Sequence, residues 1–315
     1  DRRSRAAKSD IGNPCRSGGG RDGWRHSGFL PGPRQGARQS GVSKRKEARA
    51  ILCAMRYIDT HNHLDFPEFD ADRTAVLSRS RALGVQRQVL IGVTEDHWDR
   101  LWSLACAEDG LYASFGLHPC FLDRHRPEHL SQLRERLAQR AGHAKLCAVG
   151  EIGLDHYLEQ PDKPAQQALF EAQLQLAREF ELPALLHVRR AHADAIATLK
   201  RLRLPRGGIV HAFSGSYEEA REYRRLGFYL GLGGAGTWPQ AKRMHRMLER
   251  LSLEDMVLET DAPDMAPASH PGQRNSPEFL PAICADLAKI MGVEPEALAE
   301  AAYRNSCRVF GWQEC

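Results

Sequence analysis

Eight short apolar segments alternate with longer amphipathic stretches along most of this chain, and this alternation most constrains its fold. The apolar segments lie at 57–60, 87–93, 111–117, 146–150, 183–187, 208–211, 227–232 and 256–260. The amphipathic stretches, typical of surface helices, lie at 72–83, 97–107, 127–140, 165–181, 191–202, 217–226 and 239–251, with a last helical region at 279–309. Because strand and helix patterns alternate without hairpin signals, the sequence predicts a parallel sheet.

The length of this region favours a closed barrel over an open sheet. About 260 residues follow Met55, close to the ~250 residues of a (β/α)₈ barrel. An open doubly wound sheet usually has a glycine-rich phosphate loop after its first strand. Here that position holds His61-Asn62-His63 instead. We therefore predict an α/β fold, a (β/α)₈ TIM barrel, over residues 55–315.

Residues 1–54 differ from the rest in composition and charge. Their ten Arg, three Lys and four acidic residues give a net charge of +9, so residues 55–315 carry −5 of the total of +4. We expect either a disordered basic leader or an artefact of start-site choice, since the first methionine is Met55. A nucleic-acid-binding arm is the alternative, although interleaved aromatic residues are lacking. The acidic remainder excludes a broad basic face, so a phosphate-bearing substrate would need a local site.

The cysteine pattern and the hydropathy indicate a cellular setting. The eight cysteines form no CxxC pair and no regular framework, as expected of reduced thiols in a cytoplasmic protein. No apolar run approaches the roughly 20 residues of a membrane span, and the basic N-terminal stretch does not resemble a secretory signal. No feature indicates a dimer, so we expect a monomer without membrane contact.

Six possible metal ligands follow the apolar segments, where predicted strands end. They are His61, His63, Glu151, His187, His211 and Asp261. Imidazole and carboxylate groups hold divalent metals and leave them open to water. The carboxyl ends of barrel strands share one rim, so we expect these side chains to converge there.

Each of these residues has an ordinary structural interpretation when it is taken alone. His61 and His63 could be two surface histidines, Glu151 an exposed loop residue, and His187 and His211 hydrogen-bonded core histidines. The combination argues against this, because it supplies four histidines and two carboxylates. That set is enough for two ions that share a bridging group, and two ions ~3.5–4 Å apart would activate water and bind the oxygens of a phosphodiester.

Several motifs, taken in this order, resemble those of the TatD family of metal-dependent hydrolases, which is best known for deoxyribonucleases. The motifs are His61-Asn62-His63, Gly116-Leu117-His118-Pro119, Gly150-Glu151-Ile152-Gly153-Leu154-Asp155, His211-Ala212-Phe213-Ser214-Gly215 and Leu258-Glu259-Thr260-Asp261-Ala262-Pro263. The resemblance spans residues 57 to about 312 and implies an amidohydrolase-like barrel. Finer features, such as His187-Val188-Arg189-Arg190-Ala191-His192, resemble the bacterial YjjV-like branch.

The resemblance implies how the metal ligands are divided between two divalent ions. One ion would be held by His61, His63 and Asp261, and the other by His187 and His211, with Glu151 as the bridge. This division agrees with the strand-end positions of these residues. Imidazole and carboxylate ligands suit Zn²⁺, and Mn²⁺, Mg²⁺ and Ni²⁺ remain alternatives.

Four residues are candidates for catalysis and substrate binding. Asp261 could accept a proton from the nucleophilic water, beside Glu151 as the catalytic bridge. His118 and Arg189 could contact the scissile phosphate, although a rim salt bridge is an equal alternative for Arg189. Asp155 could orient a ligand histidine.

Three functions remain open from the sequence. The first is a phosphodiesterase, a deoxyribonuclease acting on single-stranded DNA from one end with metal-activated water. The second is hydrolysis of carboxylic esters or amides, including aminoacyl-tRNA esters; Glu151 stands where amidase-like barrels have a lysine, which disfavours it. The third is a catalytically inactive metal-binding barrel, which the complete ligand set disfavours.

Overall fold

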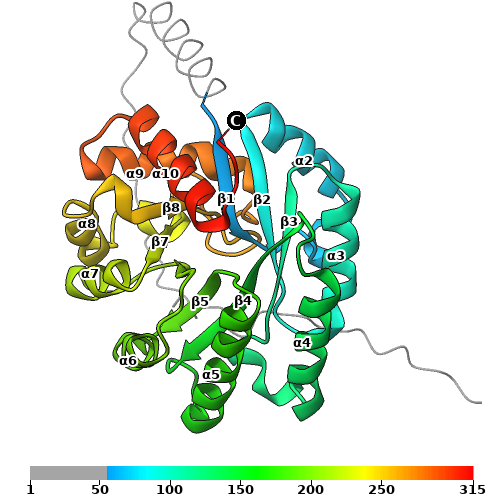
Figure 1. Ribbon diagram of the computed structural model, residues 1–315. Coiled ribbons are helices and arrows are strands. Elements are labelled where there is room, and N and C mark those ends of the chain that lie inside the picture. The colour runs from blue at the N-terminus through cyan, green and yellow to red at the C-terminus, as the bar shows by residue number, and fades with distance from the viewer. Residues whose placement is uncertain (1–54, 315) are drawn as a thin grey trace, which may run out of the picture.

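The predicted barrel is confirmed in a computed structural model, which describes residues 55–314. Eight parallel strands follow one another around a single sheet in chain order, and helices form an outer ring around them (Figure 1). The strands are β1 (Tyr57–Asn62), β2 (Val85–Ile91), β3 (Leu111–Phe115), β4 (Leu146–Asp155), β5 (Ala184–Arg189), β6 (Gly208–Val210), β7 (Phe228–Leu232) and β8 (Met256–Leu258). The expectations for residues 1–54 lie outside the described part.

The helices lie close to the predicted amphipathic stretches. They are α2 (Arg73–Ala82), α3 (Trp98–Ala107), α4 (Pro127–Arg140), α5 (Lys163–Glu179), α6 (His192–Leu202), α7 (Tyr217–Arg225), α8 (Lys242–Leu248), α9 (Leu280–Met291) and α10 (Pro295–Phe310). The last helical region forms two helices, because α9 is capped by Gly292, whose φ of +69° suits glycine. Between residues 55 and 314, no helix is long and apolar enough to cross a membrane.

Strand β4 is longer than the sequence pattern indicates. It continues through Glu151 to Asp155, so Glu151 lies within the strand rather than beyond its end. Beside β5 the ladder pairs Gly153 with His187 and Asp155 with Arg189. A Cβ on Gly153 would lie 1.9 Å from the carbonyl oxygen of His187, and φ at Gly153 is +151°. Glycine therefore allows β4 to run closely along β5 as far as Asp155.

The first and last strands are joined by a buried carboxylate as well as by backbone hydrogen bonds. The Asp261 N–H donates to the His61 carbonyl at 2.9 Å. The Asp59 carboxylate accepts from the Thr260 N–H at 2.9 Å and from its hydroxyl at 2.6 Å. Burial raises the pKa of Asp59 to about 7, although these hydrogen bonds oppose the shift. Asp59 thus fixes β1 beside the segment that carries Asp261.

Helix α10 closes the end of the barrel where the strands begin. Its Val309 and Phe310 belong to one buried hydrophobic cluster with strand side chains that include Val89 and Leu185. Asn305 of this helix donates to the carbonyls of Leu253 and Met256 at the start of β8, each at 2.8 Å.

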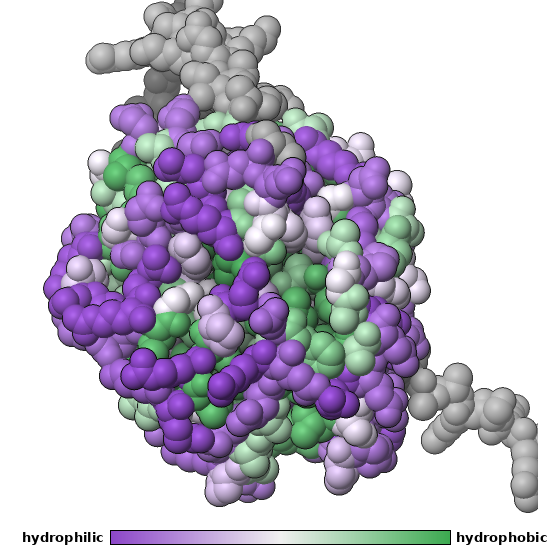
Figure 2. Space-filling view, viewed as in Figure 1, coloured by the Kyte–Doolittle hydropathy of each residue, from purple (hydrophilic) through white to green (hydrophobic). Residues whose placement is uncertain are grey.

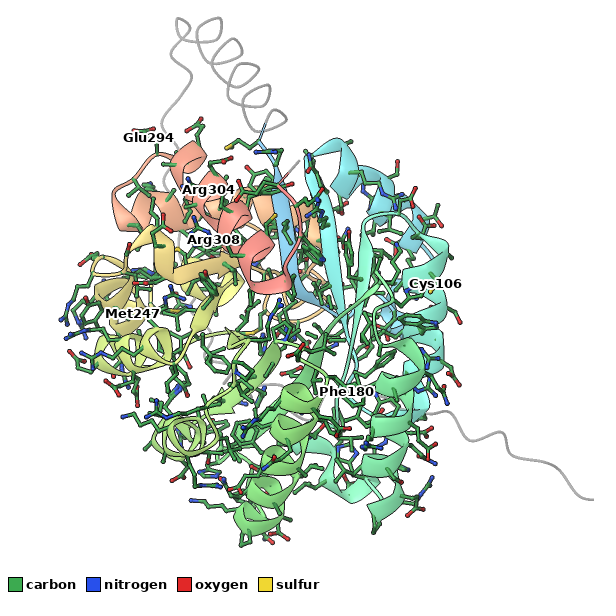
Figure 3. The ribbon with its side chains drawn as sticks, viewed as in Figure 1. Cys106, Phe180, Met247, Glu294, Arg304 and Arg308 are labelled. Atoms are coloured by element: carbon green, nitrogen blue, oxygen red, sulfur yellow. The ribbon has the colours of Figure 1, made fainter. Side chains whose placement is uncertain are left out.

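The outward side of α10 is charged. Figure 3 shows Arg304 and Arg308 on this helix, and both pair with Glu254, at 3.9 and 2.9 Å. Seen from this side, hydrophilic side chains cover most of the surface, with smaller apolar areas between them (Figure 2). The predicted site residues lie at the opposite, carboxyl ends of the strands.

Candidate metal centre

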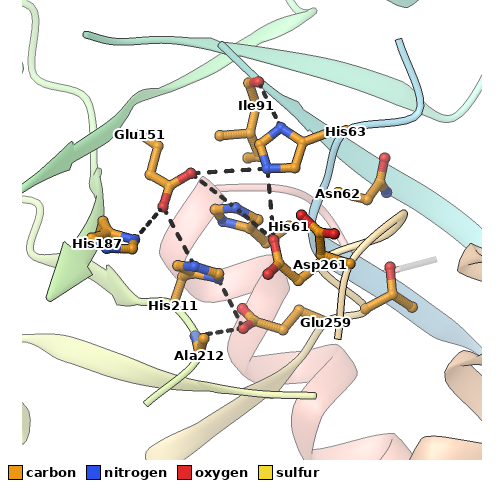
Figure 4. A network of polar contacts seen from close by, with 12 residues as sticks. His61, Asn62, His63, Ile91, Glu151, His187, His211, Ala212, Glu259 and Asp261 are labelled. Atoms are coloured by element: carbon orange, nitrogen blue, oxygen red, sulfur yellow. Dashed lines mark hydrogen bonds and ion pairs between the residues drawn. The ribbon is translucent and has the colours of Figure 1, made fainter. Parts of the chain in front are cut away.

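The six predicted ligands come together at the carboxyl ends of the strands (Figure 4). They come from β1, β4, β5 and the residues just after β1, β6 and β8. They are His61, His63, Glu151, His187, His211 and Asp261. Ligand atoms from these residues fall into clusters whose members lie within 4.8 Å of one another, among them His61–His63–Asp261 and Glu151–His187–His211. Such clusters can bind metal ions.

Glu151 lies between the two clusters, and each of its carboxylate oxygens faces one of them. Its Oε2 lies 3.3 Å from Nε2 of His61 and 3.9 Å from Nε2 of His63. Its Oε1 lies 2.9 Å from Nδ1 of His187 and 3.4 Å from Nε2 of His211. With the side chain almost fully buried, this geometry suits a carboxylate that bridges two cations.

Asp261 completes the cluster next to β1. Its Oδ1 lies 3.5 Å from Nε2 of His61 and 3.6 Å from Nε2 of His63. The residue has a left-handed backbone with φ of +58°, which aspartate tolerates better than most residues. Burial opposes its ionisation, but His211, His63 and His61 together lower the pKa of its carboxyl group. Asp261 is therefore ionised and available as a ligand.

Hydrogen bonds on the outer side of two imidazoles determine which nitrogen faces the centre. Nδ1 of His63 lies 3.2 Å from the carbonyl oxygen of Ile91, which can only accept, so this nitrogen carries the hydrogen. Nε2 of His187 lies 3.0 Å from Oδ2 of Asp155. The geometry agrees with the predicted orienting role of Asp155, whose pKa is lowered by His187 against the effect of burial.

A second orienting carboxylate, Glu259, was not predicted. Its Oε1 lies 3.2 Å from Nδ1 of His211 and 2.6 Å from the N–H of Ala212. A Cβ on Gly231 would lie 2.1 Å from the other oxygen of Glu259, so glycine provides the space for this carboxylate. A glycine inside a strand can indicate such a close approach, and Gly231 was the available sequence signal.

The ring nitrogens of His61 support metal binding independently. Both are buried and have no hydrogen-bond partner among residues 55–314. The ring stacks on that of His211, with centroids 3.7 Å apart and planes at 14°. Buried polar atoms without partners are costly, on the order of 1–3 kcal/mol each. A cation beside Nε2, between Glu151 and Asp261, would remove part of this cost, so the residues fit a divalent metal.

The charges of the centre strongly shift its pKa values. Burial disfavours the charged form of His63, but the hydrogen bond and charge of Asp261 outweigh it and raise its pKa to about 9. Burial likewise opposes charge on His211, while Asp261, Glu151 and Glu259 raise its pKa to about 9. The pKa of Glu151 is well below its usual value, because the surrounding histidines outweigh the effect of burial. This concentration of negative charge attracts cations.

His118 reaches the centre from the residue after β3. Its Nε2 lies 3.0 Å from Oε1 of Glu151, and its Nδ1 accepts the N–H of Cys120 at 3.1 Å. The hydrogen of a neutral His118 is therefore on Nε2, which points into the centre. Burial is the main cause that lowers its pKa to about 4, so the ring is neutral at physiological pH.

Arg189 lies at the end of β5, outside the cluster of ligands. Its guanidinium carbon lies 3.9 Å from the centre of the Tyr157 ring. No carboxylate in residues 55–314 forms an ion pair with it, which does not support the alternative of a rim salt bridge. Arg189 also lines the cavity that contains the metal centre.

That cavity has a volume of about 910 Å³. The predicted ligands other than His61, together with His118, lie along its wall. The remaining wall is largely apolar and includes Phe66, Phe121, Trp238, Met244 and Met265. The Trp238 N–H donates to the carbonyl of Ala266 at 2.9 Å, which fixes the ring. The cavity can therefore hold a ligand with a polar reacting group and a flat apolar portion.

Comparisons with known proteins show which family this chain is similar to. The family model described as TatD related DNase matches residues 58–311. The uncharacterized metal-dependent hydrolase YjjV of Escherichia coli K12 is 40% identical over 260 residues, which cover 82% of this chain and 99% of the relative. The crystal structure of E. coli K12 YjjV, described as a TatD homolog, has a TM-score of 0.79 and 39% identity, covering 83% of this chain and all of that one.

A further relative carries a more specific name. The 3'-5' ssDNA/RNA exonuclease TatD of Cronobacter sakazakii is 33% identical over 254 residues, covering 77% of this chain and 93% of the relative. The matched region of the family model includes all six clustered residues of the candidate centre. The chain therefore belongs to the TatD family of metal-dependent hydrolases.

Proposed function

We propose that this protein is a phosphodiesterase that shortens single-stranded DNA from one end, with two divalent cations in its metal centre. The observation that carries the proposal is the position of Glu151, whose two oxygens face two separate clusters of ligands. A pair of ions bridged in this way is suited to an in-line displacement at phosphorus. The name of the Cronobacter relative supports the choice of nucleic acid as substrate.

Under this proposal, each ion has its own protein ligands. The first would be held by His61, His63 and Asp261, whose atoms form one of the clusters. The second would be held by His187 and His211, and Glu151 would bridge the pair. This ligand set suits Zn²⁺ and is compatible with Mn²⁺, Mg²⁺ and Ni²⁺.

Two ions bound by these residues would supply a lowered pKa of the attacking water and neutralisation of charge on the phosphodiester. Asp261 is ionised and its side chain borders the cavity, so it can accept the proton of that water. Glu151 keeps the two clusters at a fixed separation, since its side chain is almost fully buried. Asparagine in place of Asp261, or glutamine in place of Glu151, would therefore perform these roles less well than the carboxylates do.

Two further residues would bind the scissile phosphate. His118 directs its Nε2–H into the centre and stays neutral, so it can donate to a phosphoryl oxygen without carrying charge. Arg189 presents a guanidinium on the cavity wall, a donor fork that matches phosphate geometry. The apolar wall that includes Trp238 and Phe121 would contact the base or the sugar.

The test uses the full chain, stripped of metal and reloaded with Mn²⁺, Mg²⁺ or Zn²⁺, with end-labelled single-stranded DNA as substrate. We expect metal-dependent shortening of the DNA. Glu151→Ala should abolish it and reduce the number of metal ions bound per chain. Glu254→Ala, at the opposite end of the barrel, is the matched control and should retain full activity.

Three other outcomes would contradict parts of the proposed function. DNA that stays intact under every metal, together with turnover of carboxylic ester or aminoacyl substrates, would overturn the phosphodiesterase and leave the metal centre in place. Bound metal without turnover of any of these substrates would instead favour an inactive metal-binding barrel. Activity that persists in Glu151→Ala would contradict the bridging role of this residue.

A further inference from the structure

A second cavity, with a volume of about 580 Å³, adjoins the one that contains the metal centre. Arg189 and Ser214 line both cavities, so the two share a wall. Arg190 and Arg243 line the second cavity and are absent from the wall of the first. A ligand that extends from the metal centre past Arg189 would therefore enter this second space.

The second cavity carries an excess of positive charge. Its wall includes the guanidinium groups of Arg189, Arg190 and Arg243, and none of them forms an ion pair with a carboxylate of residues 55–314. The acidic residue in the wall, Glu219, is already engaged, because it accepts the N–H and the hydroxyl of Ser216 at 2.6 and 2.9 Å. Three guanidinium groups thus line a cavity whose acidic residue is already hydrogen-bonded to Ser216.

Arginines elsewhere on this protein are commonly paired. On the outer helices, Arg134 pairs with Glu179, and Arg201 pairs with Glu171 at 2.5 Å. Three unpaired guanidinium groups around one cavity are therefore unlike the general surface of this chain. An anionic ligand would supply the missing partner.

The local structure holds two of these arginines against one aromatic ring. Arg189 and Arg190 place their guanidinium carbons 3.9 and 4.2 Å from the centre of the Tyr157 ring. Stacking of this kind leaves the N–H edges of a guanidinium available to a ligand. Arg190 has φ of +55°, and this turn directs consecutive arginines to the same ring before α6 begins at His192.

The ring is itself connected to the metal centre. The N–H of Tyr157 donates to Oδ1 of Asp155 at 2.8 Å, and Oδ2 of the same carboxylate lies 3.0 Å from Nε2 of His187. Asp155 therefore fixes the position of the basic cavity relative to a candidate metal ligand. A fixed spacing between two anion sites is what a ligand with regularly spaced phosphates requires.

We propose that the second cavity binds a phosphate of a nucleotide next to the scissile linkage, through Arg190 and Arg243, and that this protein therefore prefers oligonucleotides to isolated phosphodiesters. The inference rests on the proposed function and extends it to the length of the substrate. Arg189 lines both cavities and would lie between the scissile phosphate and the neighbouring phosphate.

The experiment compares two substrates on the metal-loaded full chain. One is a single-stranded decanucleotide, and the other is bis(4-nitrophenyl) phosphate, which has one phosphodiester and no neighbouring phosphate. The test variant is Arg190→Asn with Arg243→Gln, since asparagine tolerates the positive φ at position 190. The control for the loss of charge on α8 is Arg246→Gln, which removes one positive charge three residues beyond Arg243 and lines neither cavity.

We expect the double variant to raise KM for the decanucleotide roughly tenfold, the effect of losing about 1.4 kcal/mol of binding. The slope of log KM against the logarithm of the salt concentration should decrease by about 0.7 for each phosphate that the variant no longer neutralises. The value of kcat/KM for bis(4-nitrophenyl) phosphate should stay within about twofold, as for the control. Equal losses on both substrates, or unchanged KM and salt dependence for the decanucleotide, would overturn the inference and leave the proposed function standing.

A binding measurement distinguishes failure of the proposed function from failure of the inference about the second cavity. Fluorescence anisotropy of a labelled decanucleotide, with metal-stripped protein in EDTA, reports binding without hydrolysis. If the wild type cleaves neither substrate, the proposed function fails, and the basic cavity is upheld only if the double variant binds the decanucleotide more weakly than Arg246→Gln does. Equal binding by the two proteins would overturn the cavity as well.

Discussion

The carboxylate of Glu259 lies 3.2 Å from Nδ1 of His211 and determines which nitrogen of that imidazole faces the metal centre. A carboxylate accepts hydrogen bonds, so the hydrogen of the neutral ring stays on Nδ1 and the lone pair of Nε2 points toward Glu151. Nε2 is 3.4 Å from Oε1 of Glu151. Glu259 therefore positions a candidate ligand of the metal centre.

Removal of the Glu259 side chain should weaken metal binding. We expect Glu259→Ala to lower the affinity for Zn²⁺ or Mn²⁺ about 10- to 100-fold, as is typical when the partner of a ligand histidine is removed. Glu259→Gln should have a smaller effect, because its amide oxygen can still accept from His211. Titration calorimetry on metal-stripped protein measures both changes, and an unaltered affinity in Glu259→Ala would contradict the orienting role.

Gly231 should tolerate a larger side chain only when the Glu259 carboxylate is absent. In the wild type, a Cβ at position 231 would lie 2.1 Å from Oε2 of Glu259, so we expect Gly231→Ala to destabilise the protein by about 1–3 kcal/mol. In the Glu259→Ala background the same change should cost much less. Urea unfolding of the two single variants and the double variant gives the interaction energy, and additive effects would exclude the predicted clash.

The barrel and its six clustered residues could be predicted because both follow from local patterns. Periodic apolar segments indicate strands, and parallel strands of a barrel end on one rim, so His61, Glu151 and Asp261 had to converge if the strands were right. Errors of a few residues in the predicted strand bounds did not change which residues reach the metal centre. Strand β4 continues to Asp155 rather than ending at Val149-Gly150, yet Glu151 still reaches the centre.

The supporting contacts could not be predicted in the same way, because they join residues far apart in the sequence. Asp59 accepts hydrogen bonds from Thr260, 201 positions away, and Glu259 contacts His211, 48 positions away. Neither pair has a periodic signal. Likewise, the ring of Tyr157 beside Arg189 depends on the path of the chain after β4, which a loop-like sequence does not specify.

His118 should contribute to catalysis without holding metal. Its Nδ1 is occupied by the Cys120 N–H, and Nε2–H is the donor that we assign to a phosphoryl oxygen. We expect His118→Ala to reduce kcat about 100-fold, the usual effect of removing one donor to the transition state, while the bound metal per chain is unchanged. Elemental analysis alongside DNA turnover tests this, and loss of metal in His118→Ala would make the residue a ligand instead.

The pH dependence of kcat provides a second check on His118. Because burial lowers its pKa to about 4, the ring should remain neutral throughout pH 5–8. A group that is already neutral adds no step to the pH profile in that range. Wild type and His118→Ala should therefore have pH profiles of the same shape but different height, and a step near pH 6 that the variant loses would contradict the assignment.

The stability of the metal-free protein should fall as the pH rises from 7 to 9. The pKa values of His63 and His211 are raised to about 9, above the value of about 6.5 in the unfolded chain. A raised pKa stabilises the fold below the unfolded value, and this stabilisation is lost as the pH approaches the folded value. The expected loss between pH 7 and 9 is on the order of 2 kcal/mol, because the two histidines share the carboxylates of Asp261 and Glu151.

Saturating metal should reverse this trend, because the metal ion binds the neutral imidazoles and competes with their protons. Thermal unfolding of metal-stripped and Zn²⁺-loaded protein across this pH range tests both statements. His211→Asn should flatten the metal-free pH dependence, whereas His143→Asn, an exposed histidine outside the centre, should leave it unchanged. If the metal-free wild type is equally stable at pH 7 and pH 9, His63 and His211 do not carry the extra protons that the surrounding carboxylates would stabilise.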